Sequence, residues 1–218
     1  MEDISEPTGE DFAEALRQLV EYIEATNHTL VDELENVQLD EYDASGYQIK
    51  HGDHDLDLVG APELHYFSIY YSYDLASDVA VSIARGEAPS ESDQIEITEE
   101  IARQAIERLA EINSEKSDQV LGKLSSKIYQ ATSHPNLALK IDSGQTGGPR
   151  IIQVSKKIFV YSDDFGLQEF QDACQAVTTQ GLVGKGLLTQ AYNIPQMAKE
   201  MDSSESTESD DAPSRMFQ

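Results

Sequence analysis

Leu64-His-Tyr-Phe-Ser-Ile-Tyr-Tyr-Ser-Tyr73 is the stretch that decides the fold. Successive side chains of an extended strand point to opposite faces, and the odd-numbered positions from 67 to 73 are all apolar or aromatic. The even-numbered positions from 66 to 72 alternate tyrosine with serine. Because aromatic residues favour strands, this pattern predicts a strand over 64–73 with one face in the core. Asp74 follows directly and is a residue type that begins helices.

The segments before this strand predict a helix followed by further strands. Apolar residues recur at helical spacing from Phe12 to Ile23, and Thr8 stands three residues before Asp11 in a capping-box pattern, so we expect a helix over 9–25. Alternating or apolar segments at 30–39, 47–50 and 56–59, separated by turns, predict antiparallel strands. A short helix after Asp74 should end at Gly86.

The second half repeats this order of elements. Two helical stretches follow Thr98, then alternating segments at 137–141, 151–154 and 158–161, then a helix from Asp164 to Gly181. We therefore predict the α+β class, with a first α+β unit over 1–86, a linker over 87–97 and a second α+β unit with an extra N-terminal helix over 98–195. Residues 196–218, rich in serine and acidic residues, should form a disordered acidic tail.

Short matches between the halves suggest an internal duplication. Ala25-Thr-Asn-His28 corresponds to Ala131-Thr-Ser-His134, and Tyr71-Ser-Tyr-Asp74 corresponds to Tyr161-Ser-Asp-Asp164. The order helix, three strands, helix resembles the type III secretion chaperone-like fold, including the YbjN family, in tandem. The resemblance implies a non-enzymatic protein that binds other proteins as a dimer or pseudo-dimer.

The charge balance indicates a halophilic protein. Of 218 residues, 41 are acidic and 15 are basic, which gives a formal net charge of −26. At molar salt the Debye length falls to about 3 Å, so such a chain no longer repels itself while its carboxylates keep it hydrated. We expect a halophilic, archaeal cytoplasm; the alternative is a mesophilic acidic protein that binds basic proteins. The single cysteine excludes a disulfide framework, and the sequence has neither a signal peptide nor an apolar run of membrane-spanning length.

The charge is also unevenly distributed. Residues 1–100 carry 26 acids and 3 bases, whereas residues 101–200 carry 10 acids and 11 bases. In a chain selected for acidic surface, a neutral half indicates a covered surface, and the cover is the first half, a second copy or another protein. Lys116, Lys123 and Lys127 are expected on one helix face and are candidate protein contacts. Nucleic acid is an unlikely partner because phosphate contacts weaken steeply with salt.

Tyr66 and Tyr70 are further candidate protein contacts. They lie on the face of the predicted strand opposite Phe67 and Ile69, where they form either an exposed aromatic patch or a second core face under helices.

The densest group of potential metal ligands is His51, Asp53, His54 and Asp55. Imidazole and carboxylate suit a divalent transition ion, although an exposed turn explains the same residues. No catalytic constellation is present: the histidines match no nucleophile-elbow or zincin spacing, and Cys174 falls among apolar residues of a predicted helix. The glycine-rich segments 143–150 and 181–186 predict a hairpin loop and a turn between helices. We therefore expect a non-catalytic, chaperone-like or regulatory adaptor without a cofactor, and as the alternative a divalent-metal-binding protein or hydrolase that uses the histidine cluster.

Overall fold

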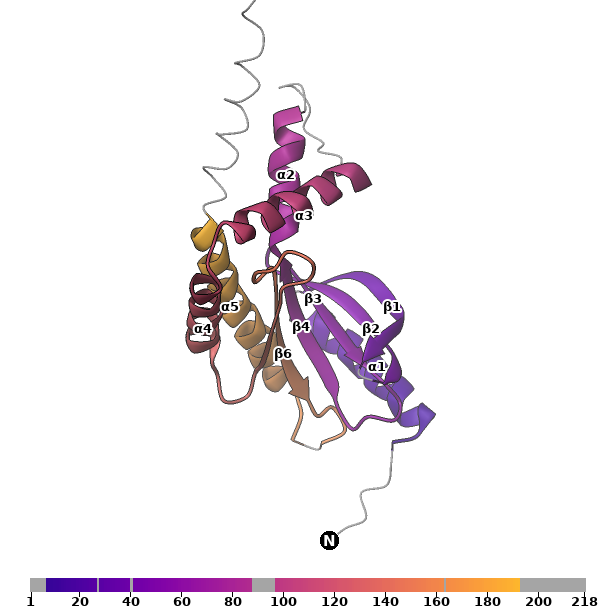
Figure 1. Ribbon diagram of the computed structural model, residues 1–218. Helices are drawn as coiled ribbons and strands as arrows, with labels where there is room; N and C mark the ends of the chain where they lie inside the picture. The colour runs from indigo at the N-terminus through magenta and orange to yellow at the C-terminus, as the bar shows by residue number, and fades with distance from the viewer. Residues whose placement is uncertain (1–6, 27, 40, 88–96, 163, 193–218) are drawn as a thin grey trace, which may run out of the picture. The chain divides into compact units, whose positions relative to one another are not determined.

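The structure is a computed structural model that describes residues 7–26, 28–39, 41–87, 97–162 and 164–192. Its helices and strands follow the order α1 (Gly9–Ala25), β1 (Thr29–Leu39), β2 (Tyr42–His51), β3 (His54–Gly60), β4 (Phe67–Asp74), α2 (Leu75–Glu87), α3 (Glu99–Ser114), α4 (Asp118–Thr132), β5 (Ala138–Asp142), β6 (Ile151–Ile158) and α5 (Leu167–Tyr192) (Figure 1). The predicted α+β class is confirmed.

All six strands belong to one antiparallel sheet, in the order β1-β2-β3-β4-β6-β5. Hairpin pairings join the first four strands, with Leu58 of β3 opposite Ile69 of β4. A strand edge exposes unpaired backbone groups, and β6 takes the edge of β4 that β3 leaves open. The expected pair of similar units, each with its own sheet, is therefore corrected: the strands of both halves share one sheet, and the structure shows no internal duplication.

The chain divides into two compact units that are interleaved along the sequence. Of the described residues, those within 1–73, 126–141 and 151–185 form the sheet unit, and those within 74–125, 142–150 and 186–218 form the helical unit. The chain enters and leaves the sheet more than once, and the helical unit contains residues from both sides of the predicted boundaries at 86 and 98. The expected linker over 87–97 lies outside the described residues except at its ends, and the expected tail over 196–218 lies outside them entirely.

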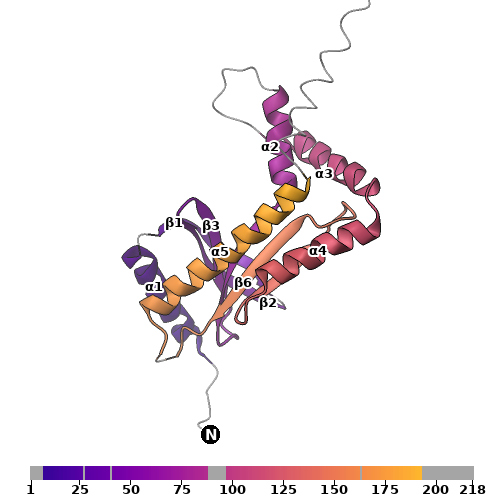
Figure 2. The same ribbon diagram turned by 90° about the vertical axis from the view of Figure 1, so that its left-hand side faces the viewer.

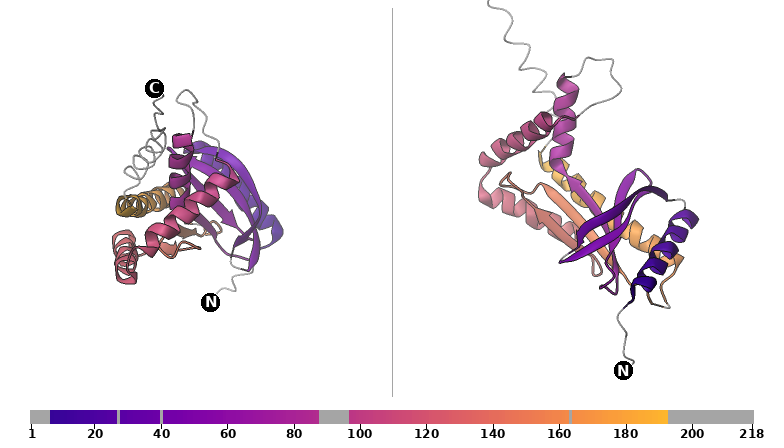
Figure 3. Two further views of the ribbon diagram at one scale, coloured as in Figure 1. Left: turned by 45° about the horizontal axis from the view of Figure 1, so that its top comes forward. Right: turned by 90° about the vertical axis from the view of Figure 1, so that its right-hand side faces the viewer.

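Helix α1 covers part of one face of the sheet. Its start is fixed by the predicted capping box: Asp11 N donates to Thr8 Oγ1 and Thr8 N donates to Asp11 Oδ2. The ring of Phe12 stacks on Phe67 of β4, with centroids 5.3 Å apart and planes 6° from parallel. Leu19 and Ile23 follow on the same helix face and are buried. The amphipathic pattern of 9–25 thus places α1 against the odd-numbered side chains of β4, and the right-hand view of Figure 3 shows α1, in indigo, beside the strands.

Helix α5 covers the same face and runs straight through the segment that we expected to be a turn (Figure 2). Gly181 does not end the helix, because its missing side chain makes room for Tyr71: a Cβ there would lie 2.2 Å from Tyr71 Cδ1. A Cβ on Gly184 would likewise lie 3.1 Å from Ile152 Cγ2. Close packing of the helix on the sheet, not a turn, accounts for these two glycines.

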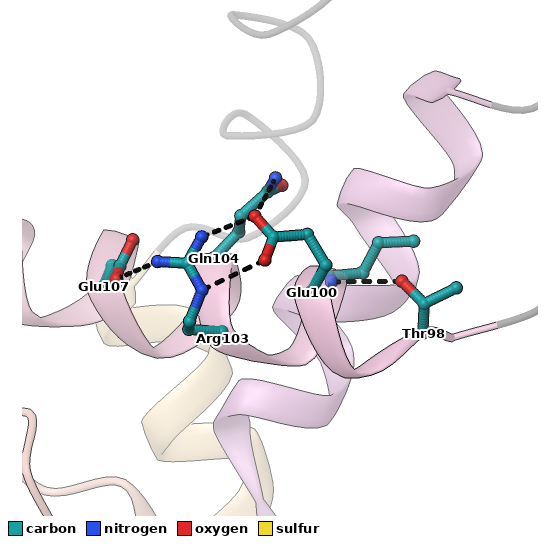
Figure 4. Close-up of polar contacts among 6 residues, drawn as sticks. Thr98, Glu100, Arg103, Gln104 and Glu107 are labelled. Atoms are coloured by element: carbon teal, nitrogen blue, oxygen red, sulfur yellow. Dashed lines mark hydrogen bonds and ion pairs between the residues drawn. The ribbon is translucent and has the colours of Figure 1, made fainter.

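Within the helical unit, side-chain caps fix the helix starts. Asp74 Oδ1 accepts from Ala76 N at the start of α2, as predicted, and Thr98 Oγ1 accepts from Ile101 N at the start of α3. Figure 4 shows Arg103 of α3 held between Glu100 and Glu107 on the exposed side of that helix. Pairs of this kind at i,i+3 and i,i+4 lie next to each other on a helix surface and support the helix only weakly when they are exposed.

The loop between β5 and β6 is held in the helical unit by buried polar contacts. Gly144 and Gly147 have φ values of 51° and 71°, which only glycine adopts without strain, so the predicted hairpin loop is confirmed. Asn113 of α3 is 4% exposed; its Nδ2 donates to Thr146 O at 2.9 Å, and its Oδ1 accepts from the Tyr192 hydroxyl at 2.6 Å. These bonds satisfy buried groups that would be costly to leave unpaired.

Candidate binding groove

The two faces of β4 differ sharply in burial. On the face under α1 and α5, Phe67 and Ile69 are fully buried and Tyr71 is 5% exposed. On the opposite face, Tyr66 and Tyr70 are only half-buried and Ser72 is exposed. Over the described residues, the second face is therefore only partly covered, and it carries the two tyrosines that the sequence singled out. We call it the open face.

A groove of about 710 Å³ runs along the open face within the sheet unit. Side chains of β4 and β6 form its floor, and the segment leading into β5 forms one wall. Its described lining consists of Leu39, Tyr66, Ser68, Tyr70, Pro135, Asn136, Leu137, Ala138, Ser155, Lys156, Lys157 and Phe159. We refer to these residues as the open-face groove. At this volume it accommodates a few amino-acid side chains of a bound segment.

Three side chains form the aromatic and cationic part of the groove. Lys157 Nζ lies 3.8 Å from the centroid of the Tyr66 ring, a cation–π contact. Phe159 meets the same ring edge-on, at a centroid distance of 6.3 Å and an interplanar angle of 65°. The side chain of Phe159 is 55% exposed, so it offers apolar surface to solvent. A large aromatic residue held in this way is a typical anchor point of a protein interface.

The charge of the groove is opposite to that of the chain as a whole. The chain carries 41 acidic and 15 basic residues, yet the described lining contains two lysines and no aspartate or glutamate. The described lining also holds no histidine or cysteine. The arrangement is suited to binding apolar and acidic side chains.

Sequence reasoning found Tyr66 and Tyr70 but missed Lys157 and Phe159. We expected a separate strand over 158–161, whereas β6 is one strand, Ile151–Ile158. Along β6, Ile152, Val154 and Ile158 are buried, and the alternate positions therefore face the open side. Reading 151–159 as a single alternating strand would have placed Lys157 and Phe159 on that side.

The three lysines proposed as contacts do not lie on one helix. Lys116 is in the turn between α3 and α4, where its Nζ lies 3.9 Å from the centroid of the Tyr192 ring. Partial burial lowers the pKa of Lys116. Lys123 and Lys127 both lie on α4 and are exposed. The turn at Ser117, whose carbonyl accepts from Val120 N and Leu121 N, separates the first lysine from the other two.

The structure does not gather the proposed metal ligands His51, Asp53, His54 and Asp55. His51 and His54 are partners across the β2–β3 turn, but the His51 ring contacts His28 and the His54 ring contacts Tyr71 edge-on at 6.2 Å. Asp53 and Asp55 are exposed, and Asp55 lies on the opposite face of β3 from His54 because adjacent strand residues alternate. Within the described ranges, no group of three or more His, Cys, Asp or Glu side chains is placed to hold a metal ion.

Cys174 is a buried structural thiol. Its side chain is fully buried in α5, and burial raises the pKa of the thiol to about 12. A thiol that stays protonated at neutral pH is a poor nucleophile.

None of the helices in the described part of the chain is both long and apolar enough to cross a bilayer.

Comparison with known proteins supports the fold and adds no function. No protein family matches the chain, and no curated protein sequence matches it. A solved structure with a similar fold is the crystal structure of an uncharacterized protein from Methanothermobacter thermautotrophicus, with a TM-score of 0.50 and 10% sequence identity. The similarity covers 85% of this chain and 97% of that one. At this identity the similarity concerns the fold alone.

Proposed function

We propose that this chain is a non-catalytic, chaperone-like or regulatory adaptor that binds a segment of another protein in the open-face groove. The observation that carries the proposal is the groove itself: an exposed phenylalanine, a tyrosine under a lysine, and no carboxylate in the described lining of a chain with 41 acidic residues. The occupant that fits is a segment with one or two large apolar side chains flanked by aspartate or glutamate.

Charge complementarity selects this occupant. Because the chain has a net charge of −26, most of its surface repels acidic segments. A groove with a lysine and no carboxylate in its described lining is therefore the surface to which an acidic segment binds. At molar salt the Debye length is about 3 Å, and only carboxylates in direct contact with Lys157 benefit. The apolar contacts with Tyr66 and Phe159 do not depend on charge and therefore supply most of the binding free energy.

The cellular setting belongs to the same proposal. The excess of acidic residues supports a halophilic, archaeal cytoplasm. In such a cytoplasm exposed surface is selected to be acidic, so a surface without carboxylates indicates that a partner covers it. The order of elements, which resembles the type III secretion chaperone-like fold in tandem, supports protein binding as the activity. The partner is another protein and not a nucleic acid, because phosphate contacts weaken steeply with salt.

The test is a selection from random 12-residue peptides against the full chain in 2 M KCl, followed by affinity measurement by fluorescence anisotropy. We expect the selected peptides to be enriched in a large apolar residue next to aspartate or glutamate. Tyr66→Ala and Phe159→Ala should each weaken their binding at least tenfold. Lys157→Glu should weaken acidic peptides more than their glutamine analogues. Tyr129→Ala, which removes an aromatic residue that is 47% exposed on α4, is the matched control and should leave affinity unchanged.

Two results would overturn the proposal. One is a set of selected peptides whose affinity is the same for Tyr66→Ala, Phe159→Ala and Tyr129→Ala. The other is a wild-type chain that is dimeric by light scattering and becomes monomeric with Phe159→Ala, which would assign the groove to a second copy of the chain.

A further inference from the structure

Two histidines that are far apart in the sequence face each other at one end of the sheet unit. His28 follows α1 and His51 ends β2; their rings lie with centroids 4.7 Å apart and planes 24° from parallel, and His28 Nε2 is 2.6 Å from His51 Nδ1. The outer nitrogen of each ring also has a neighbour. His28 Nδ1 is 2.5 Å from Thr26 Oγ1, and His51 Nε2 is 3.3 Å from Gln175 Oε1 of α5.

The neighbours determine where the ring hydrogens lie. The amide oxygen of Gln175 only accepts, because its Nε2 donates to Thr179 Oγ1, so His51 carries its hydrogen on Nε2. The hydroxyl of Thr26 has one hydrogen, which it donates to Tyr22 O at 2.6 Å, so Thr26 Oγ1 accepts from His28 Nδ1. In the neutral tautomers that result, neither His28 Nε2 nor His51 Nδ1 carries a hydrogen.

The two inner nitrogens therefore point their lone pairs at each other across 2.6 Å. Two lone pairs at this distance repel unless a cation lies between them or beside them. A metal ion meets that need, because the outer nitrogen of each ring already donates its hydrogen to an oxygen acceptor and both inner nitrogens are left as ligands. Neutral imidazoles whose outer N–H groups are both held by oxygen acceptors are in the state in which histidine ligates metals.

We propose that His28 Nε2 and His51 Nδ1 bind a divalent transition-metal ion of the kind that prefers imidazole, such as Zn²⁺ or Ni²⁺. Metal–nitrogen bonds of about 2.0–2.1 Å in tetrahedral geometry place two ligand nitrogens about 3.4 Å apart. The two nitrogens are now 2.6 Å apart, so they must separate by about 0.8 Å. His28 lies in the connection between α1 and β1, and His51 is the last residue of β2, so a shift of this size is inexpensive.

The space beside the pair leaves room for the remaining ligands. A pocket of about 410 Å³ opens next to the two rings, and Asp172 and Gln171 of α5 line it. Asp172 is exposed, and its Oδ1 accepts from Gln168 Nε2 at 2.8 Å. The protein thus supplies two nitrogens, and water molecules complete the coordination. This site shares only His51 with the cluster that the sequence suggested.

The test uses the full chain without a histidine tag, stripped with EDTA, in 2 M KCl. Titration with ZnCl₂ or NiCl₂ by calorimetry should show one ion bound per chain, and saturation should raise the thermal midpoint by at least about 2 °C. His28→Gln and His51→Asn should each weaken binding at least tenfold. His65→Asn, which changes an exposed histidine outside the pair, should leave binding unchanged.

Exposed Gln175 provides a second test that does not disturb the core. Gln175→Ala removes the acceptor that orients His51 and should weaken metal binding about tenfold, whereas Gln175→Glu should strengthen it because a carboxylate makes the imidazole a better donor. A merely structural role for Gln175 predicts no such opposite effects. Absence of one-to-one binding, or equal affinities of wild type, His28→Gln and His51→Asn, would overturn the proposal. Peptide binding by His28→Gln should be unchanged, so this test and that of the groove fail independently.

Discussion

Replacing Asp74 should destabilise the protein more than any other single carboxylate change that we describe, because Asp74 has two roles. Its Oδ1 caps α2 by accepting from Ala76 N at 2.9 Å. The same carboxylate binds Arg150 in a two-point contact, with Nε donating to Oδ1 at 2.8 Å and Nη2 donating to Oδ2 at 2.5 Å. Asp74→Ala removes both interactions at once, within the helical unit.

The expected loss follows from the burial of the pair. Loss of a cap costs about 1 kcal/mol. The Arg150 and Asp74 side chains are 17% and 30% exposed, so their pair lies between an exposed pair, worth about 0.2–1 kcal/mol, and a buried one, whose disruption costs about 3–5 kcal/mol. We take about 1–2 kcal/mol for the pair and about 2–3 kcal/mol for Asp74→Ala in total. For a chain of this length that corresponds to a fall of roughly 5–10 °C in the thermal midpoint.

The assay is thermal unfolding followed by circular dichroism in 2 M KCl, with two companion variants. Asp74→Asn keeps a good capping residue and loses only the charge, so it should lose about 1–2 kcal/mol. Glu14→Gln breaks the pair between Glu14 and Arg17, whose side chains are 65% and 72% exposed, and should change stability by less than about 0.5 kcal/mol. If Asp74→Ala proved no more destabilising than Glu14→Gln, or if the Ala and Asn variants were equal, the two-role account of Asp74 would be refuted.

Two further predictions concern packing and salt. Gly181→Ala should lower the free energy of unfolding by about 1–3 kcal/mol, because the new Cβ would lie 2.2 Å from Tyr71 Cδ1. Gly186→Ala should raise the free energy of unfolding by about 0.5–1 kcal/mol, because a Cβ there has nothing within 4 Å. Urea titration of both variants measures this contrast. Raising KCl from 0.2 to 2 M should raise the thermal midpoint by at least about 10 °C, because screening relieves the repulsion of a net charge of −26. A midpoint that is independent of KCl would favour the mesophilic alternative.

Local structure was predictable from sequence because local interactions determine it. The capping box at Thr8, the cap at Asp74 and the alternation along β4 each depend on residues within a few positions of one another, and all three are confirmed. The burial of Cys174 followed in the same way from its apolar neighbours.

What sequence reasoning missed depends on contacts between distant residues. Gly181 looked like the end of a helix because nothing near it in sequence shows that Tyr71 packs against it. At the end of α1 the Thr26 hydroxyl donates to Tyr22 O, and His28 contacts His51, which is 23 residues away and which no local pattern connects to it. The pairing of β4 with β6 was hidden for the same reason, and so was the groove that lies over both strands.

The place of β6 next to β4 has a consequence for synthesis of the chain. β4 ends at Asp74, whereas β6 begins only at Ile151. At about 5–20 residues per second, a ribosome takes on the order of 4–15 s to make the intervening chain, and during that time the aromatic strand has one unsatisfied edge. Such an edge invites pairing with a neighbouring nascent chain. Misassembly between nascent chains should therefore be looked for first on polysomes, where many copies of this chain are synthesised side by side.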